Sequence, residues 1–263
     1  MQKARTIHFH DDPGLICAAR AEADQARSIY HRCIVCGLLS AELFANVDSY
    51  SYRRCSVCQA TFLDPTQRMS TEEEFEHYRN HRNDPADKNY RRFLSKLADP
   101  LLQRLSPHAK GLDYGCGPGP ALACMLGEAG HRVGVFDPLF FPDPEPLDDL
   151  YDFITCTETI EHFHWPADEF ARFDRMLRPG GWLALMTCFQ TDDDYFGSWY
   201  YRRDPTHVVF YSEVTLRHIA HRFGWTCEIP LKDVALMHKP DKVCQGKSFL
   251  AEIRWKSGLI GGL

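Results

Sequence analysis

The spacing of hydrophobic positions separates a helical stretch from a longer stretch in which strands and helices alternate. Over 67–105, apolar side chains recur every three or four residues, which predicts helices with one apolar face. The clearest set is Tyr90, Phe93, Leu94 and Leu97. Ser70 and Glu73 have the spacing of a helix capping box. We interpret 67–105 as a helical connector whose last helix ends at Pro100 and whose aromatic residues pack rather than bind a ligand.

From residue 106 onward, short apolar runs alternate with amphipathic segments. The runs predict buried strands over 111–114, 131–136, 151–156 and 182–187. The segments between them predict helices over 121–128, 168–177 and 212–223. Two last strands, over 226–229 and 234–238, are expected to pair in antiparallel fashion. This alternation predicts an α/β fold with a Rossmann-like, doubly wound sheet over 106–240.

Four of the eleven cysteines form two close pairs, Cys33 with Cys36 and Cys55 with Cys58. The pattern C-x2-C-x18-C-x2-C is typical of a zinc ribbon. Each pair can direct two thiolates at one ion, and two pairs complete the tetrahedral four-sulfur site of structural Zn2+. The alternative is a set of ordinary reduced cysteines. We predict a small zinc ribbon over 30–66, with strands near 50–54 and 60–63.

A glycine-rich loop follows the first predicted strand of the α/β part. Gly115, Gly117 and Gly119 allow a ligand to approach the backbone, and their spacing differs from that of a dinucleotide-binding loop. Asp113 precedes the loop and suits a cationic group. Asp137 ends the second predicted strand, where a carboxylate can accept both hydroxyls of a ribose. The site therefore predicts a nucleoside that carries a positive charge.

Four motifs, in the order LDYGCGPG, GVFDP, YDFITCTETIEHF and LRPGGWLALMT, resemble those of class I S-adenosylmethionine-dependent methyltransferases. The resemblance covers about 111–240. The order of a cysteine ribbon, EEEFEHYRN and this domain resembles bacterial methyltransferases of the methyltransferase-23 type, which are similar to ubiquinone methylases. The resemblance implies S-adenosyl-L-methionine as the cofactor and a seven-stranded sheet whose last strand is reversed.

The resemblance also implies roles for individual residues. Those that would hold the methionine portion of the cofactor are Asp113, Gly115, Cys116, Gly117 and Gly119. Asp137 and Pro138 would lie at the ribose, and Thr157 and Glu158 would flank the reacting methyl group. The family has a further helix and strand after Asp137, which this sequence has largely lost from 138–150. Phe140 and Phe141 would cover the adenine instead.

Two histidines, His162 and His207, are candidate general bases, because imidazole titrates near working pH. The alternative for each is a histidine that only makes hydrogen bonds within a loop. The segment ETIEH over 158–162 also resembles the acidic and histidine cluster that supports a divalent metal in ubiquinone-type O-methyltransferases. The aromatic residues over 195–201 either cover a substrate or pack on the sheet.

Composition narrows the classes of function. Thirty Lys and Arg against 36 Asp and Glu give a net charge of −6, which disfavours a broad nucleic-acid interface. No apolar run is long enough for a membrane span, and the first residues lack the apolar core of a signal peptide. We expect a cytoplasmic enzyme that methylates an oxygen or nitrogen of a small molecule. An RNA methyltransferase that grips its substrate with the ribbon and a non-catalytic cofactor-binding scaffold are the alternatives. Residues 1–29 and 241–263 are expected to form an N-terminal extension and a C-terminal tail.

Overall fold

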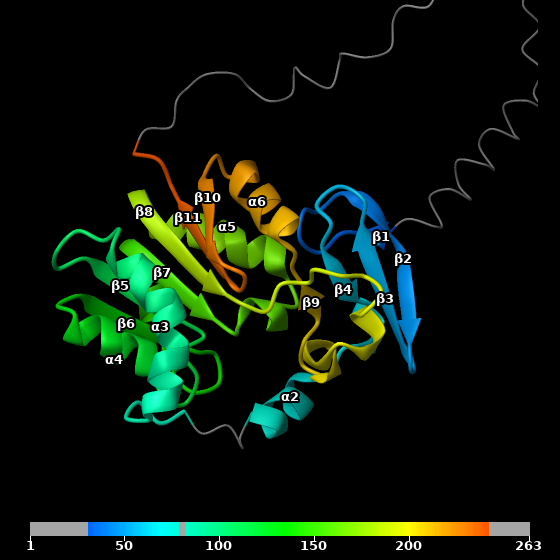
Figure 1. The fold of residues 1–263 in the computed structure, drawn as a ribbon, viewed down its shortest axis with the longest axis horizontal. Coiled ribbons are helices and arrows are strands. Elements are labelled where there is room, and N and C mark those ends of the chain that lie inside the picture. Colours follow the sequence, from blue (N-terminus) through cyan, green and yellow to red (C-terminus); the bar gives the residue numbers. More distant parts are fainter. Residues whose placement is uncertain (1–30, 79–82, 242–263) are drawn as a thin grey trace, which may run out of the picture.

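The larger of two sheets has six strands in the order β10-β11-β8-β7-β5-β6 (Figure 1). The computed structural model describes residues 31–78 and 83–241, so the predicted extension and all but the first residue of the predicted tail lie outside the described residues. Four strands are parallel: β5 (Lys110–Tyr114), β6 (Arg132–Phe136), β7 (Tyr151–Thr157) and β8 (Leu177–Met186). The hairpin of β10 (Thr226–Leu231) and β11 (Val234–His238) adds β11 antiparallel to β8. The predicted reversal of the last strand is confirmed.

Helices cover both faces of this sheet, as predicted for a doubly wound fold. On one face lie α3 (Lys88–Leu102) and α4 (Ala121–Glu128), whose leucines pack with Phe153 of β7. On the other face lie α5 (Pro166–Met176) and α6 (Glu213–Arg222), which pack with Ile154 of the same strand. Neighbouring residues of a strand point to opposite faces, so β7 contributes to two cores at once.

Two predictions about this part of the chain are wrong. The prediction that Pro100 ends the helix fails, because α3 continues to Leu102. A proline in the last turn removes a single helical hydrogen bond, while Leu101 beyond it is fully buried in the core. The prediction of seven strands is also not met in the part of the chain that the structure describes, where the sheet has six. Between β6 and β7 the described chain forms only the short 3-10 helix η2 (Glu145–Asp148), in line with the loss expected over 138–150.

The second sheet is antiparallel and has five strands in the order β1-β2-β3-β4-β9. Its members are β1 (His31–Arg32), β2 (Leu39–Val47), β3 (Tyr50–Cys55), β4 (Thr61–Leu63) and β9 (Val209–Phe210). The two strands predicted for the ribbon are β3 and β4, whereas β2 and β9 were not predicted. In Figure 1 the four N-terminal strands lie beside β9, which belongs to the segment between β8 and α6. The ribbon and the α/β part therefore share a sheet, and they also share one apolar core.

Short elements complete the fold: η1 (Pro65–Gln67), α2 (Thr71–Tyr78), η3 (Ile160–His162), η4 (Phe196–Ser198) and η5 (Tyr200–Arg203). The predicted capping box precedes α2, with the Ser70 amide donating to Glu73 Oε2 (2.8 Å) and the Glu73 amide donating to Ser70 Oγ (3.3 Å). None of the helices within the described residues has the length and apolar character needed to cross a bilayer.

Candidate active site

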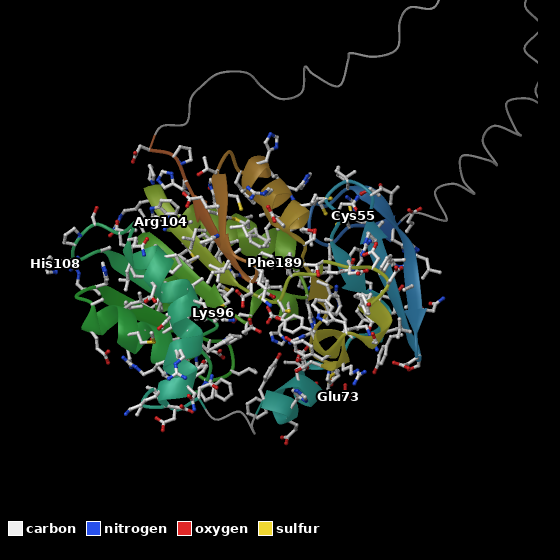
Figure 2. The ribbon with its side chains drawn as sticks, viewed as in Figure 1. Cys55, Glu73, Lys96, Arg104, His108 and Phe189 are labelled. Atoms are coloured by element: carbon white, nitrogen blue, oxygen red, sulfur yellow. The ribbon has the colours of Figure 1, made fainter. Side chains whose placement is uncertain are left out.

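A cavity of about 550 Å³ opens at the carboxyl ends of β5, β6 and β7, where ligands bind in open α/β sheets. Helices α2 and α3 flank it; Figure 2 labels Glu73 on the first and Lys96 on the second. The predicted site residues that line the cavity are Asp113, Gly115, Cys116, Gly117, Asp137, Pro138, Thr157, Glu158, His162 and His207. The fold thus brings the predicted cofactor residues and both candidate bases to one space.

The glycine loop has a backbone that only glycine adopts readily. Gly115 has φ +75° and Gly117 has φ +65°. A Cβ on Gly115 would lie 2.2 Å from the Thr159 side chain, and a Cβ on Gly119 would lie 1.6 Å from the Asn83 carbonyl oxygen. Gly119 does not line the cavity but lets Asn83 lie directly on the loop. The loop is therefore closely packed on both sides.

Asp137 connects the loop to the segment after β6. Its Oδ2 accepts from the Gly117 amide (2.9 Å), and its Oδ1 accepts from the amides of Leu139 (2.9 Å) and Phe140 (3.1 Å). Carboxylate oxygens have lone pairs beyond those these bonds use, so the fixed carboxylate can still accept from a diol. Of the two phenylalanines predicted to cover the adenine, Phe140 lines the cavity, whereas Phe141 pairs through its backbone with Asp137.

Asp113 lies at the bottom of the cavity and is 3% exposed. Its Oδ1 accepts from Thr155 Oγ1 (2.8 Å). Burial raises the pKa of this carboxyl to about 6, because the charged form loses its water. Burial also raises the pKa of the nearby Cys116 thiol, which keeps it neutral. A cationic ligand group would favour the ionised form of Asp113.

His162 and His207 lie together at the other end of the cavity, with ring centroids 4.7 Å apart. Nδ1 of His162 is 3.0 Å from the Thr206 carbonyl oxygen, and Nδ1 of His207 is 2.7 Å from that of Tyr201. A carbonyl oxygen only accepts, so Nδ1 of His207 carries the proton and its Nε2 keeps the lone pair. Nδ1 of His162 also lies 2.7 Å from the Tyr78 hydroxyl, and the direction of that hydrogen bond sets its tautomer. Burial, together with the charge of His162, lowers the pKa of His207. His207 is thus oriented as a neutral base.

Two carboxyl groups and a tyrosine hydroxyl adjoin the histidines. Glu161 is fully buried and accepts from Tyr201 (2.5 Å) and Thr187 (3.0 Å), while Glu158 lies 3.2 Å from the same Tyr201 hydroxyl. Burial and the charge of Glu161 raise the pKa of Glu158 to about 8. The pair therefore retains a proton near neutral pH.

The four predicted cysteines converge within the ribbon. All are buried, and the Sγ atoms of Cys33 and Cys58 and those of Cys36 and Cys55 are each 3.6 Å apart. A tetrahedral site with Zn–S distances of about 2.3 Å requires sulfur separations of about 3.8 Å. Cys33 Sγ also accepts from two amides of its own turn, as does Cys55 Sγ. The cluster has the spacing and the supporting amides of a four-sulfur zinc site.

A family model for a methyltransferase domain matches residues 55–228, which is more than half of the chain. The chain belongs to this methyltransferase family. It is a class I S-adenosylmethionine-dependent enzyme, as the sequence motifs implied. Comparison of the methyltransferase with curated proteins gave no match.

Two solved structures similar to the methyltransferase come from Burkholderia thailandensis. One is 1,6-didemethyltoxoflavin-N1-methyltransferase with bound 1,6-didemethyltoxoflavin and S-adenosylhomocysteine. It is 16% identical, the match covers 77% of this chain and 100% of that chain, and the TM-score is 0.45. The other is an O-methyltransferase family protein, 14% identical, with 66% of this chain and 64% of that chain covered and a TM-score of 0.45.

Several residues that line the cavity of the methyltransferase were not predicted. Tyr90, treated as a packing residue, faces Asp113, and burial raises the pKa of its hydroxyl to about 12. Asn83 lies on the glycine loop, and Tyr78 of α2 places its hydroxyl 2.7 Å from His162 Nδ1. The spacing of Tyr90 showed the apolar face of α3. The same spacing could not show that Tyr90, at one end of this apolar face, borders the cavity.

The structure also changes the donor set considered for a divalent metal. Glu161, His162 and His207 each offer one ligand atom, and these atoms lie within 4.8 Å of one another. The set contains His207 in place of Glu158, which the ETIEH motif had suggested. Two imidazoles and one carboxylate are suitable donors for a first-row divalent metal, so this end of the methyltransferase site could hold one.

Proposed function

We propose that this methyltransferase binds S-adenosylmethionine at the carboxyl ends of β5 and β6 and methylates an oxygen or nitrogen of a small molecule. The observation that carries the proposal is the single cavity that Asp113 and Asp137 line together with His162 and His207. S-adenosylmethionine, when bound, supplies a methyl group on a sulfonium that is a good leaving group.

The residues of the chain have complementary roles in this proposal. Asp113 meets the cationic end of the cofactor, and Asp137, held by three backbone amides, accepts the ribose hydroxyls. Thr157 and Glu158 line the same cavity and would flank the reacting methyl group. His207 at its Nε2, or His162, takes a proton from the acceptor, so that a neutral hydroxyl or an amine becomes a nucleophile. Apolar residues such as Phe93 and Phe163 exclude water from the lining.

We further propose that Cys33, Cys36, Cys55 and Cys58 hold one structural Zn2+. The sulfur separations, the burial and the amide donors support this assignment. Because protein sulfurs would fill all four positions, the ion would have no open coordination site for a substrate. Its contribution would be to the stability of the ribbon.

The RNA alternative has local support from six arginines in and after the ribbon: Arg53, Arg54, Arg79, Arg82, Arg91 and Arg92. Within the described residues, three of them are paired with a carboxylate. Arg53 binds Asp64 (2.7 Å), Arg54 binds Asp193, and Arg91 binds Glu128. A guanidinium already paired with a carboxylate is less available for phosphates. These ion pairs favour the small-molecule proposal. Arg79 and Arg82 lie outside the described residues.

Calorimetric titration with S-adenosylmethionine and S-adenosylhomocysteine tests the cofactor site. We expect micromolar binding to the wild-type protein. Asp137→Ala should weaken it at least about 100-fold, because two hydrogen bonds to a carboxylate are lost at about 1.5–3 kcal/mol each. Asp99→Ala, on the exposed side of α3, is the matched control and should bind normally. Equal affinity of Asp137→Ala and wild type would refute the ribose assignment.

A panel of small phenols, alcohols and amines with labelled methyl donor tests the acceptor class. Transfer to at least one of them, at a rate that salt does not suppress, supports the proposal. Transfer only to RNA, with an affinity that falls steeply as salt rises, would favour the RNA alternative. Binding of the donor with no transfer to either would favour the scaffold.

A further inference from the structure

The ribbon reaches the histidine end of the cavity through a short series of backbone contacts. The Cys55 amide donates to the Ala60 carbonyl oxygen (3.0 Å) and closes the second cysteine turn, which leads directly into β4. Strand β4 pairs with β9 at Thr61↔Phe210 and Phe62↔Val209. The Leu63 amide extends the pairing by donating to the Val208 carbonyl oxygen (2.9 Å). The second cysteine turn is thus connected through β4 to Val208, the residue that follows His207.

The segment that β4 holds also carries the turn with the other histidine. The Val208 amide donates to the Glu161 carbonyl oxygen (2.9 Å), and the Tyr211 hydroxyl donates to the Ile160 carbonyl oxygen (3.0 Å). Two consecutive carbonyls of η3 are therefore bound to one segment, 208–211. Since η3 contains His162, this segment fixes the position of both candidate bases.

Tyr211 links the core that contains the cysteine cluster to η3. It is fully buried in the core that also contains Cys33, Cys55 and Cys58. After burial, the charges of Glu161, Cys156, Cys58 and Cys33 contribute to raising the pKa of its hydroxyl. Its ring packs edge-on against Phe170 of α5, with ring centroids 6.4 Å apart, while its hydroxyl reaches the Ile160 carbonyl.

The cofactor end has supports of a different origin. The Gly115 amide donates to the Phe136 carbonyl oxygen (2.8 Å), and the Gly117 amide donates to Asp137 (2.9 Å). These bonds join β5 to β6 within the large sheet. The ribbon strands β1 to β4 take no part in them.

We infer that Tyr211 is a positioning residue that, with β4, transmits the metal-bound state of the ribbon to η3 and so to His162 and His207. The inference rests on the proposed role of these histidines at the acceptor. Its consequence is selective: loss of the metal, or of the Tyr211 hydroxyl, displaces the histidine end and leaves the cofactor end unchanged. The ribbon thereby forms part of the acceptor site.

The test uses the full-length protein with its metal. Tyr211→Phe keeps the buried ring and removes only the hydroxyl bond to Ile160. Tyr195→Phe is the control, because Tyr195 is 69% exposed. The readouts are the NMR ring signals of His162 and His207, assigned with His162→Gln and His207→Gln, and calorimetric binding of S-adenosylhomocysteine. A second sample is wild-type protein from which the metal has been removed with a chelator and then restored.

We expect Tyr211→Phe to move the His162 signals beyond any change in Tyr195→Phe, with S-adenosylhomocysteine affinity within twofold of wild type. Metal removal should move the signals of both histidines, and metal addition should restore them. Unchanged histidine signals in Tyr211→Phe would overturn the inference. A loss of S-adenosylhomocysteine affinity in Tyr211→Phe that accompanies the signal changes would overturn it as well, because both ends of the cavity would then be disturbed. If wild-type protein fails to bind S-adenosylhomocysteine, the cofactor proposal fails, but the histidine signals still decide the positioning role.

Discussion

The two ends of the cavity are built in different ways. The cofactor end comes from one stretch, in which the glycine loop and Asp137 are 18 residues apart and bind each other through the Gly117 amide. The histidine end comes from segments distant in sequence, since His162 follows β7, His207 precedes β9 and Tyr78 ends α2. The first end is encoded as a local motif. The second exists only because the ribbon sheet and the large sheet meet.

This contrast has a practical meaning for the chemistry. A loop that binds a common cofactor needs the same geometry whatever the methyl acceptor is. Hydrogen bonds between residues close in sequence hold this geometry. The acceptor end must suit one substrate, and here its walls come from α2, the segment after β7 and the segment after β8. Variation in those outer elements can change the acceptor without disturbing the cofactor site.

The largest effect expected is from breaking the cysteine cluster. Cys55→Ser should release the proposed zinc and lower stability by several kcal/mol, because binding free energy of a structural metal is folding free energy. Cys124→Ser is the control, since Cys124 is an exposed cysteine. Metal analysis and thermal unfolding measure both variants. Full retention of metal by Cys55→Ser would contradict the four-sulfur assignment.

Replacing the general base should distinguish most clearly between the roles of the two ends of the cavity. His162→Gln or His207→Gln, whichever removes the base, should slow methyl transfer about 10²–10⁴-fold. The affinity for S-adenosylmethionine should stay within about twofold, because neither ring belongs to the cofactor end. Single-turnover rates with an acceptor from the panel provide the measurement. If neither variant slows transfer by more than about tenfold, the histidines are structural.

A pair of glycine substitutions tests how tightly the cofactor end is packed. Gly119→Ala would bring a Cβ to 1.6 Å from the Asn83 backbone oxygen and should destabilise the fold by about 1–3 kcal/mol. Gly127→Ala, in α4 with open space around it, should stabilise by about 0.5–1 kcal/mol. Thermal unfolding of the two variants with and without S-adenosylmethionine compares them. Equal stabilities would show that Asn83 does not press on the loop.

The pH dependence of cofactor binding should be the smallest of these effects. The pKa of Asp113 is about 6, and its ionised form suits a cation. Affinity for S-adenosylmethionine should therefore fall up to about tenfold for each pH unit below 6. Stability changes in the opposite direction, because the folded pKa exceeds the usual value of 3.8. The contribution of Asp113 to the free energy of unfolding is complete below pH 3.8 and is lost as the pH rises through 6.

Titration calorimetry from about pH 5 to pH 8 measures the dependence. Asp113→Asn keeps a side-chain acceptor for Thr155, and it should bind more weakly at pH 7 without the acid-side decline. A decline of the same size in this variant would assign the titration to another group.

The sequence predicted most of what is local. The α/β elements, the glycine loop, the antiparallel pairing of the last two strands and the convergence of the four cysteines all appear where periodicity and spacing placed them. The reversal of the last strand was implied by the family resemblance. It did not predict β9, since a two-residue strand has no readable pattern and its partner β4 lies almost 150 residues away. The position of Tyr90 at the cavity was missed for a similar reason. Helical spacing identifies the apolar face of α3 but not the parts of the fold that this face contacts. Pro100 shows that burial of Leu101 outweighs one lost hydrogen bond.

The short connection after β6 also bears on how the protein avoids aggregation with other copies of itself. Among residues 31–78 and 83–241 the large sheet has six strands, with β6 at its edge. An open edge is a template for aggregation through intermolecular strand pairing. The segment that follows contains Pro138, Pro142, Pro144 and Pro146, and its 3-10 helix η2 contacts β6. Proline has no amide hydrogen to offer a foreign strand. A proline-rich cover thus takes over the protective role that an additional strand would have had, and it keeps the edge from recruiting a neighbour.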